Sequence, residues 1–312
     1  MENYAFGIDI GGTTIKMGLF TADGILQRNW EIPTRKDDGG SLILTDIAKA
    51  VEEGLGIEGI SIEQICGIGM GVPGPVLGEC TVNKCVNLGW GTVNVADEMK
   101  RLTGVANIKA GNDANVAALG EMWQGGGKGH ENVVMVTLGT GVGGGIILNG
   151  RIVPGTFGAG GEIGHMKMSK SETMACGCGK KGHLEQYASA TGIVRKAQEL
   201  LSESDRPSAL RDAAYLSAKQ VYDCAKNGDE VSLEIVDFVG GMLGTALSYI
   251  SCVIDPEIYV IGGGVSKAGT ILIESIRKHF KENAFHASTE TAFALAQLGN
   301  DAGMYGAVKL VL

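Results

Sequence analysis

A cluster of metal-ligating side chains stands out in one glycine-rich segment of the sequence. Two histidines and two cysteines fall within 19 residues: His165, Cys176, Cys178 and His183. Two imidazoles and two thiolates suit tetrahedral zinc, and four protein ligands leave no place for a reactive water. The sequence therefore predicts a structural zinc that orders the loop and holds the flanking Glu162 and Glu185 as acceptors for substrate hydroxyls. The alternative is a loop with the same residues and no metal.

Two strand–glycine turn–strand segments repeat along the chain. Residues 6–20 read FGIDIGGTTIKMGLF and residues 136–148 read VTLGTGVGGGIIL; without a gap, Asp9 aligns with Thr137 and Gly11 with Gly139. Glycine turns can direct backbone N–H groups at phosphate oxygens. The repeat predicts two similar lobes with a polyphosphate between them. The alternative is a chance alignment of two apolar, glycine-rich hairpins.

The second turn also matches a dinucleotide fingerprint, since residues 139–144 read GTGVGG. That motif requires its glycines to open a helix, whose N-terminus binds the pyrophosphate. Here the chain continues as Gly145-Ile-Ile-Leu148, which is typical of a strand. The context excludes a dehydrogenase.

Two carboxylates accompany these elements. Asp9 ends the first strand, where a bound Mg²⁺ would relieve its repulsion from phosphate; the alternative is an aspartate that caps its own turn. Asn112 and Asp113 open a helical pattern, and both are preferred N-cap residues. The functional interpretation is that Asp113 accepts the proton of a hydroxyl as that hydroxyl attacks phosphorus.

The hydrophobic pattern predicts the elements that must position these residues. Strands are expected at 27–33, 65–71, 258–261 and 292–296, and helices at 41–55, 94–102, 189–201, 217–225, 229–253, 268–280 and 301–312. Alternating strands and helices indicate an α/β fold. The best boundary between lobes lies near residues 119–129, where a helix gives way to Gly125-Gly-Gly-Lys-Gly129.

Composition narrows the class of protein. The chain has 312 residues, about two domains' worth, and a net charge of −9, which argues against a nucleic-acid surface. Its longest apolar stretches are too short for a membrane span, and no export signal precedes the first strand. Seven scattered cysteines are typical of a reduced, cytoplasmic protein.

Several of these motifs together resemble the ROK family of sugar kinases, and within it the bacterial ATP-dependent glucokinases. Asp9-Ile-Gly-Gly-Thr13 looks like the first phosphate motif and Leu138–Gly145 like the second. Val72-Pro-Gly-Pro75 and Asn87-Leu-Gly-Trp90 are similar to the loops of the sugar lobe, and Ile261–Val265 to the adenosine-side loop.

The resemblance implies a two-lobed actin/Hsp70-like fold, of the duplicated ribonuclease H-like type, with a zinc-stapled loop. The smaller lobe would span 1–120 with a C-terminal helix at about 301–312, and the larger lobe 121–300. Asp113 would be the catalytic base. Sugar hydroxyls would meet Asn112, Asp113, Glu162, His165 and Glu185. ATP and Mg²⁺ would meet Asp9, Gly11, Gly12, Thr13, Thr14, Gly139, Thr140, Gly141, Gly262, Gly263 and Gly264.

The chain departs from the family in its zinc set, which elsewhere has one histidine and three cysteines; His183 replaces the third cysteine here. The expected reaction is phosphorylation of an aldohexose, glucose first, by a cytoplasmic homodimer. Alternatives are a kinase for mannose, fructose, allose or N-acetylmannosamine, a non-catalytic sugar sensor, or an actin/Hsp70-type ATPase. The family's repressors carry a DNA-binding domain ahead of the first phosphate motif, which the position of Asp9 disfavours.

Overall fold

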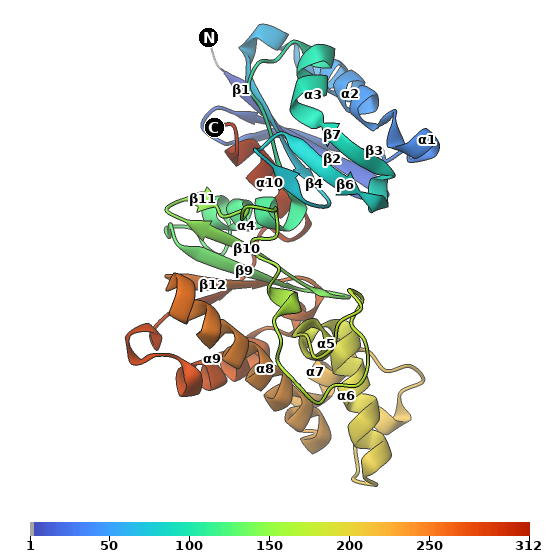
Figure 1. The fold of residues 1–312 in the computed structure, drawn as a ribbon, viewed down its shortest axis with the longest axis vertical. Coiled ribbons are helices and arrows are strands. Elements are labelled where there is room, and N and C mark those ends of the chain that lie inside the picture. The colour runs from blue at the N-terminus through green and yellow to red at the C-terminus, as the bar shows by residue number, and fades with distance from the viewer. Residues whose placement is uncertain (1–2) are drawn as a thin grey trace. The chain divides into compact units, whose positions relative to one another are not determined.

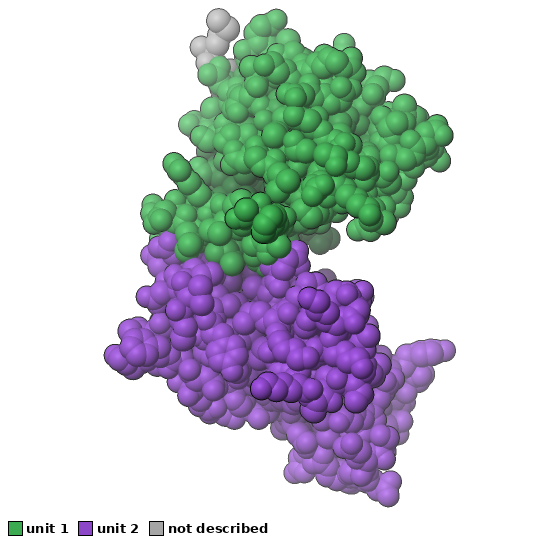
Figure 2. All heavy atoms as spheres, in the orientation of Figure 1, with its two compact units in different colours: residues 1–131, 145–161, 297–312 green, residues 132–144, 162–296 purple. Residues whose placement is uncertain are grey.

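The computed structural model describes residues 3–312. The chain forms two compact units (Figure 2). Unit 1 comprises residues 1–131, 145–161 and 297–312, and unit 2 comprises residues 132–144 and 162–296. The predicted lobes, 1–120 with 301–312 and 121–300, stay a prediction; the compact units have bounds of their own.

Unit 1 is built on a five-stranded sheet in the order β3-β2-β1-β4-β8. Its strands are β1 (Tyr4–Ile10), β2 (Thr14–Thr21), β3 (Leu26–Pro33), β4 (Ile65–Val72) and β8 (Ile108–Asn112). The first three are antiparallel neighbours, and β4 and β8 continue the sheet in parallel. Burial follows position, because the edge strand β3 alternates between half-buried and exposed residues while β4 is almost wholly buried.

Helices and a small three-stranded sheet complete unit 1 (Figure 1). The helices are α1 (Asp37–Gly40), α2 (Ile43–Glu58), α3 (Val95–Thr103), α4 (Asp113–Gln124) and α10 (Ala302–Lys309). The small sheet has the order β5-β6-β7, with β5 (Val76–Leu77), β6 (Thr81–Cys85) and β7 (Trp90–Asn94). Gly69 of β4 lets α10 approach the sheet closely, since a Cβ there would lie 1.7 Å from the Ala307 carbonyl oxygen.

Unit 2 contains most of a second sheet, in the order β11-β10-β9-β12-β13. Its strands are β9 (Val133–Leu138), β10 (Val142–Leu148), β12 (Ile258–Gly262) and β13 (Ala292–Leu295); the short β11 (Arg151–Ile152) and the end of β10 are counted with unit 1. Strand β12 runs parallel to β9 and β13. In chain order, both five-stranded sheets therefore read third, second, first, fourth, fifth strand.

The helices of unit 2 are α5 (Glu185–Ala188), α6 (Ala190–Glu203), α7 (Ala218–Lys226), α8 (Glu230–Ile254) and α9 (Thr270–Asn283). Helices α8 and α9 lie side by side (Figure 1). Gly244 makes their approach possible, because a Cβ there would lie 2.6 Å from the Phe280 nitrogen. Within the described residues, α8 alone is long and apolar enough to cross a membrane, but 61% of its apolar window is buried in the protein, as in the core helix of a soluble protein.

The repeated topology confirms the predicted α/β fold of duplicated, actin/Hsp70-like type. The two hairpins detected in the sequence are β1–β2 and β9–β10, the corresponding strands of the two sheets. The predicted helices and strands are present with bounds shifted by a few residues.

Candidate functional site

The first glycine turn joins β1 to β2 and is braced by the residue that follows β3. The Gly11 nitrogen donates to the Thr14 carbonyl oxygen at 3.0 Å and closes the turn. Thr34 donates twice to the turn: its hydroxyl to the Gly11 carbonyl oxygen at 2.7 Å and its nitrogen to the Thr13 carbonyl oxygen at 2.9 Å. A Cβ on Gly12 would meet nothing within 4 Å, so the tip of the turn is open to a ligand.

Asp9 lies near the end of β1, beside this turn, and is half-buried. Helix α10 comes so close that a Cβ on Gly303 would lie 2.6 Å from the Asp9 carboxylate. Burial, and after it the negative charge of Asp113, raise the pKa of Asp9 to about 6 against the opposing effect of Lys16. The site therefore favours either a proton or a cation beside Asp9, which fits the predicted Mg²⁺ position.

Asn112 and Asp113 stand where β8 ends and α4 begins. The Asn112 side-chain oxygen caps the helix by accepting from the nitrogens of Ala114 at 3.1 Å and Asn115 at 3.2 Å. Its Nδ2 atom donates to Asp113 Oδ1 at 3.0 Å and to the Gly74 carbonyl oxygen at 3.2 Å. Capping thus belongs to Asn112, while Asp113 is half-buried and held by its neighbour beside the predicted sugar-lobe loop 72–75.

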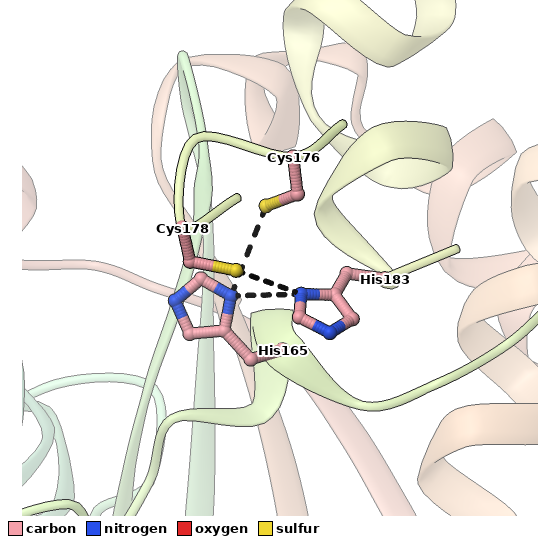
Figure 3. Close-up of side chains that lie close together, drawn as sticks. All are labelled: His165, Cys176, Cys178 and His183. Carbon is pink, nitrogen blue, oxygen red and sulfur yellow. Dashed lines mark hydrogen bonds between the residues drawn. The ribbon is translucent and has the colours of Figure 1, made fainter. Parts of the chain in front are cut away.

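The four metal-ligating residues converge in unit 2 (Figure 3). One ligand atom from each of His165, Cys176, Cys178 and His183 lies within 4.8 Å of all the others. The two Nδ1 atoms are 3.2 Å apart, and Cys178 Sγ lies 3.4 Å from His183 Nδ1. Two imidazole nitrogens and two sulfurs facing one centre fit a zinc ion.

Electrostatics around the cluster favour the metal-binding form of its buried histidine. Burial lowers the pKa of His183, and the nearby charges of His165, Lys167 and Lys180 lower it further. A neutral imidazole has a lone pair for a metal. The structure thus brings the predicted ligands together, His183 included; zinc itself stays a prediction.

The two flanking glutamates lie in different surroundings. Glu162 is exposed, and its Oε2 atom is 3.8 Å from His165 Nε2. Glu185 points toward the second glycine turn: its Oε2 atom accepts from the Val142 nitrogen at 3.0 Å, and its Oε1 atom lies 3.4 Å from Cys176 Sγ. Glu185 therefore links the metal cluster to the turn, and its predicted contact with sugar stays a prediction.

The second glycine turn, between β9 and β10, lies against the predicted adenosine-side loop. The Gly139 nitrogen donates to the Gly141 carbonyl oxygen at 2.9 Å. Gly263 backs onto the turn with φ +83°, and a Cβ there would lie 2.4 Å from the Leu138 carbonyl oxygen. Only glycine fits at this position, so Gly263 packs directly against Leu138, the residue that leads into the turn.

The structure groups the predicted residues by unit. Unit 1 brings together Asp9, residues 11–14, Asn112 and Asp113; unit 2 brings together the metal cluster, Glu162, Glu185 and residues 139–141 and 262–264. Sequence reasoning missed Thr34 and Gly303, which shape the first turn and the Asp9 site. The glycines at 303 and 306 of the last helix were a usable signal, because helical glycines often mark close packing.

These features define the class of protein. A duplicated α/β topology, a glycine turn after the first strand of each sheet and a carboxylate at a helix N-terminus are those of a phosphotransferase with the actin/Hsp70-like fold. The chain belongs to the ROK family, whose model matches residues 5–312.

Known proteins support this assignment over nearly the whole chain. A glucokinase of Halalkalibacterium halodurans is 43% identical over 99% of this chain and 95% of that protein. A ROK family glucokinase from Streptomyces griseus, solved with glucose and AMPPNP, is 31% identical with a TM-score of 0.74 over 99% of both chains. A ROK hexokinase from Thermus thermophilus is 29% identical with a TM-score of 0.77, over 99% of this chain and 97% of that one. The resemblance found in the sequence is confirmed.

Proposed function

We propose that this protein is a glucokinase, which transfers the γ-phosphoryl group of ATP to the 6-hydroxyl of an aldohexose, with glucose as its main substrate. The observation that carries the proposal is the Asp113 carboxylate, fixed at the start of α4 by Asn112 at 3.0 Å. Full-length similarity to glucokinases supports the same reaction.

Asp113 acts as the general base. The hydroxyl oxygen of the sugar attacks the γ-phosphorus, the bond from that phosphorus to ADP breaks, and the hydroxyl proton passes to the Asp113 carboxylate. The Asp113 Oδ1 atom accepts from the Ala114 nitrogen at 2.8 Å as well as from Asn112. Two donors on one oxygen fix the orientation of the carboxylate before the substrate arrives.

The nucleotide phosphates would bind to backbone N–H groups of the glycine turns, at Gly11, Gly12, Thr13 and Thr14 and at Gly139, Thr140 and Gly141. Residues 262–264 meet the adenosine side. Asp9 would hold the cation that accompanies ATP, since its site disfavours an uncompensated charge. Bound Mg²⁺ supplies neutralising charge on the phosphates.

His165 serves both the metal and the sugar. Its Nδ1 atom faces the cluster, 3.2 Å from His183 Nδ1, while its Nε2 atom faces outward near Glu162. A ring held through one nitrogen presents the other in a fixed direction. Zinc bound by the four ligands would order the loop, and the sugar hydroxyls would meet Asn112, Asp113, Glu162, His165 and Glu185.

A coupled assay of ADP release tests the reaction. The panel contains glucose, mannose, fructose, allose, N-acetylglucosamine and N-acetylmannosamine, with a blank that lacks sugar. Asp113→Ala should abolish turnover, whereas Asp97→Ala should not; Asp97 is paired with the N-cap residue Asn94 of α3 at 2.6 Å and is a matched control. Turnover of Asp113→Ala within a few-fold of the wild type would remove Asp113 as the base, and ADP release without sugar would favour an ATPase.

Cytoplasmic location and a homodimer are part of the same proposal. The scattered cysteines of the chain support the first, and the family resemblance supports the second. Fractionation of cells and light scattering of the purified protein test them, with an elution mass of one chain as the result that contradicts the dimer.

A further inference from the structure

The second glycine turn is held from one side by α5 and the first residues of α6. The Ala190 nitrogen donates to the Gly139 carbonyl oxygen at 2.8 Å. The Thr191 hydroxyl donates to the Thr140 carbonyl oxygen, also at 2.8 Å. With the bond from the Val142 nitrogen to Glu185 Oε2, three consecutive peptide groups of the turn are fixed from residues 185–191.

These bonds determine where the remaining N–H groups of the turn point. In a planar trans peptide, the C=O and the following N–H point in opposite directions. Because the carbonyls of Gly139 and Thr140 point at α6, the N–H groups of Thr140 and Gly141 point away from it. Two successive N–H groups aimed at one side form a site that suits a phosphate oxygen.

Thr191 is itself held in place at the start of α6. Its hydroxyl donates to Thr140, so it accepts from the Ser189 hydroxyl, 2.9 Å away. Ser189 is the N-cap of α6 and also accepts from the Gly192 nitrogen at 3.1 Å. Ser189, Thr191 and Thr140 thus form a short chain of hydrogen bonds from the helix cap to the turn, in which each bond polarises the next.

The same segment is attached to the metal cluster at its other end. Glu185 contacts Cys176, and the Gln186 side-chain oxygen accepts from the nitrogens of Gly182 at 2.7 Å and His183 at 3.1 Å. The Gln186 amide also donates to the Met174 carbonyl oxygen at 3.0 Å. Residues 185–191 are thus hydrogen-bonded to both the metal cluster and the second glycine turn. A loop ordered by metal binding can therefore hold the turn in a fixed conformation.

We propose that Thr191 is a positioning residue for the nucleotide, and that the segment Glu185–Thr191 couples metal binding at the Cys/His cluster to phosphate binding at the second glycine turn. The inference rests on the proposed function, because it assumes that the turn binds ATP and ADP. It assigns the metal a second effect, on nucleotide affinity, in addition to ordering the loop.

Calorimetric titration with MgADP, without sugar, tests the role of Thr191. Thr191→Val removes the hydroxyl and should weaken MgADP binding about threefold or more, the order expected for one hydrogen bond. Thr191→Ser keeps the hydroxyl and should restore most of the affinity. Thr291→Val is the matched control, because the Thr291 hydroxyl also donates to a carbonyl at 2.8 Å, that of Ser288, but does not contact the turn.

The coupling is tested by removing the metal. Zinc content per chain and the MgADP dissociation constant are measured before and after chelation, with circular dichroism to verify folding. Loss of zinc should weaken MgADP binding in a chain that stays folded, and added zinc should restore it. The outcomes that overturn the inference are unchanged MgADP affinity in Thr191→Val or in the folded, zinc-free protein. A wild type that binds no MgADP at all would instead contradict the proposed function, and the inference would fall with it.

Discussion

Glu121 gives the sharpest test of how unit 1 is held together. This residue of α4 is completely buried. Its Oε2 atom accepts from the nitrogens of Gly126 at 2.8 Å and Gln297 at 2.9 Å, and its Oε1 atom accepts from the Leu298 nitrogen at 2.8 Å. One carboxylate thus joins the end of α4 to the segment that precedes α10, within unit 1.

The magnitude follows from the donors that each substitution leaves without an acceptor. Glu121→Ala leaves three partly buried N–H groups without their acceptor, at about 1 kcal/mol each, so we expect a loss of about 3 kcal/mol in the free energy of unfolding. Glu121→Gln keeps the shape of the side chain. Of the two possible orientations of the amide, the more favourable one keeps its oxygen as the acceptor for Gly126 and Gln297. Its NH₂ group then faces the Leu298 nitrogen, so we expect the free energy of unfolding to fall by about 1–3 kcal/mol.

Urea unfolding, followed by circular dichroism, measures both variants. The expected order of stability is wild type, then Glu121→Gln, then Glu121→Ala. Glu98→Gln is the control, because Glu98 is an exposed partner of Arg101 in a surface pair worth at most about 1 kcal/mol. A Glu121→Ala variant within about 1 kcal/mol of the wild type, or one more stable than Glu121→Gln, would refute this reasoning.

Three further substitutions test the Asp9 site, the helix packing and the metal set. Because the folded chain raises the pKa of Asp9 to about 6, ionisation of Asp9 lowers stability progressively from about pH 4 to pH 6 and fully above pH 6. Asp9→Asn should therefore be more stable than the wild type at pH 8, by up to about 3 kcal/mol, and equally stable at pH 4, as urea midpoints would show. Gly306→Ala places a Cβ 1.7 Å from the Val116 carbonyl oxygen and should cost about 2 kcal/mol or more in the same measurement. His183→Ala should lower bound zinc well below one ion per chain, measured by elemental analysis.

Each of these expectations has a result that contradicts it. An Asp9→Asn variant whose advantage does not change between pH 4 and pH 8 would show that Asp9 titrates normally. For the helix packing, Gly56→Ala is the control, since a Cβ on this helical glycine meets nothing within 4 Å, and equal stability of the two variants would count against a tight α4–α10 contact. Full zinc content in His183→Ala would remove His183 from the ligand set.

The hydrophobic pattern predicted most elements because their burial is set by local sequence. The hairpins were visible as apolar runs around a glycine turn, and α8 as a long apolar helix. The small sheet β5-β6-β7 was not predicted. Its central strand β6 is short and mixes exposed Asn83 and Lys84 with buried Val82, so neither an alternating nor an apolar pattern identifies it.

The residue types of the candidate site could be predicted from the sequence, but the residues that hold them in place could not. Metal ligands and glycine turns have signatures in the sequence because the chemistry demands particular side chains at close spacing. Glu121 and Thr191 have none, since Gln297 lies 176 residues from Glu121 and Thr140 lies 51 residues from Thr191 along the chain. A glutamate in an amphipathic helix is indistinguishable from a solvated one until the fold brings three backbone donors to it.

Unit 1 is discontinuous along the chain, and this affects how it folds during synthesis. Helix α10 fills the space left by Gly69 in β4 and packs on α4, yet residues 297–312 are translated after all of unit 2. At a translation rate of about 5–20 residues per second, the synthesis of residues 132–296 takes roughly 10–30 s. During that time the face of the first sheet on which α10 packs is exposed to chaperones and proteases, until residues 297–312 follow.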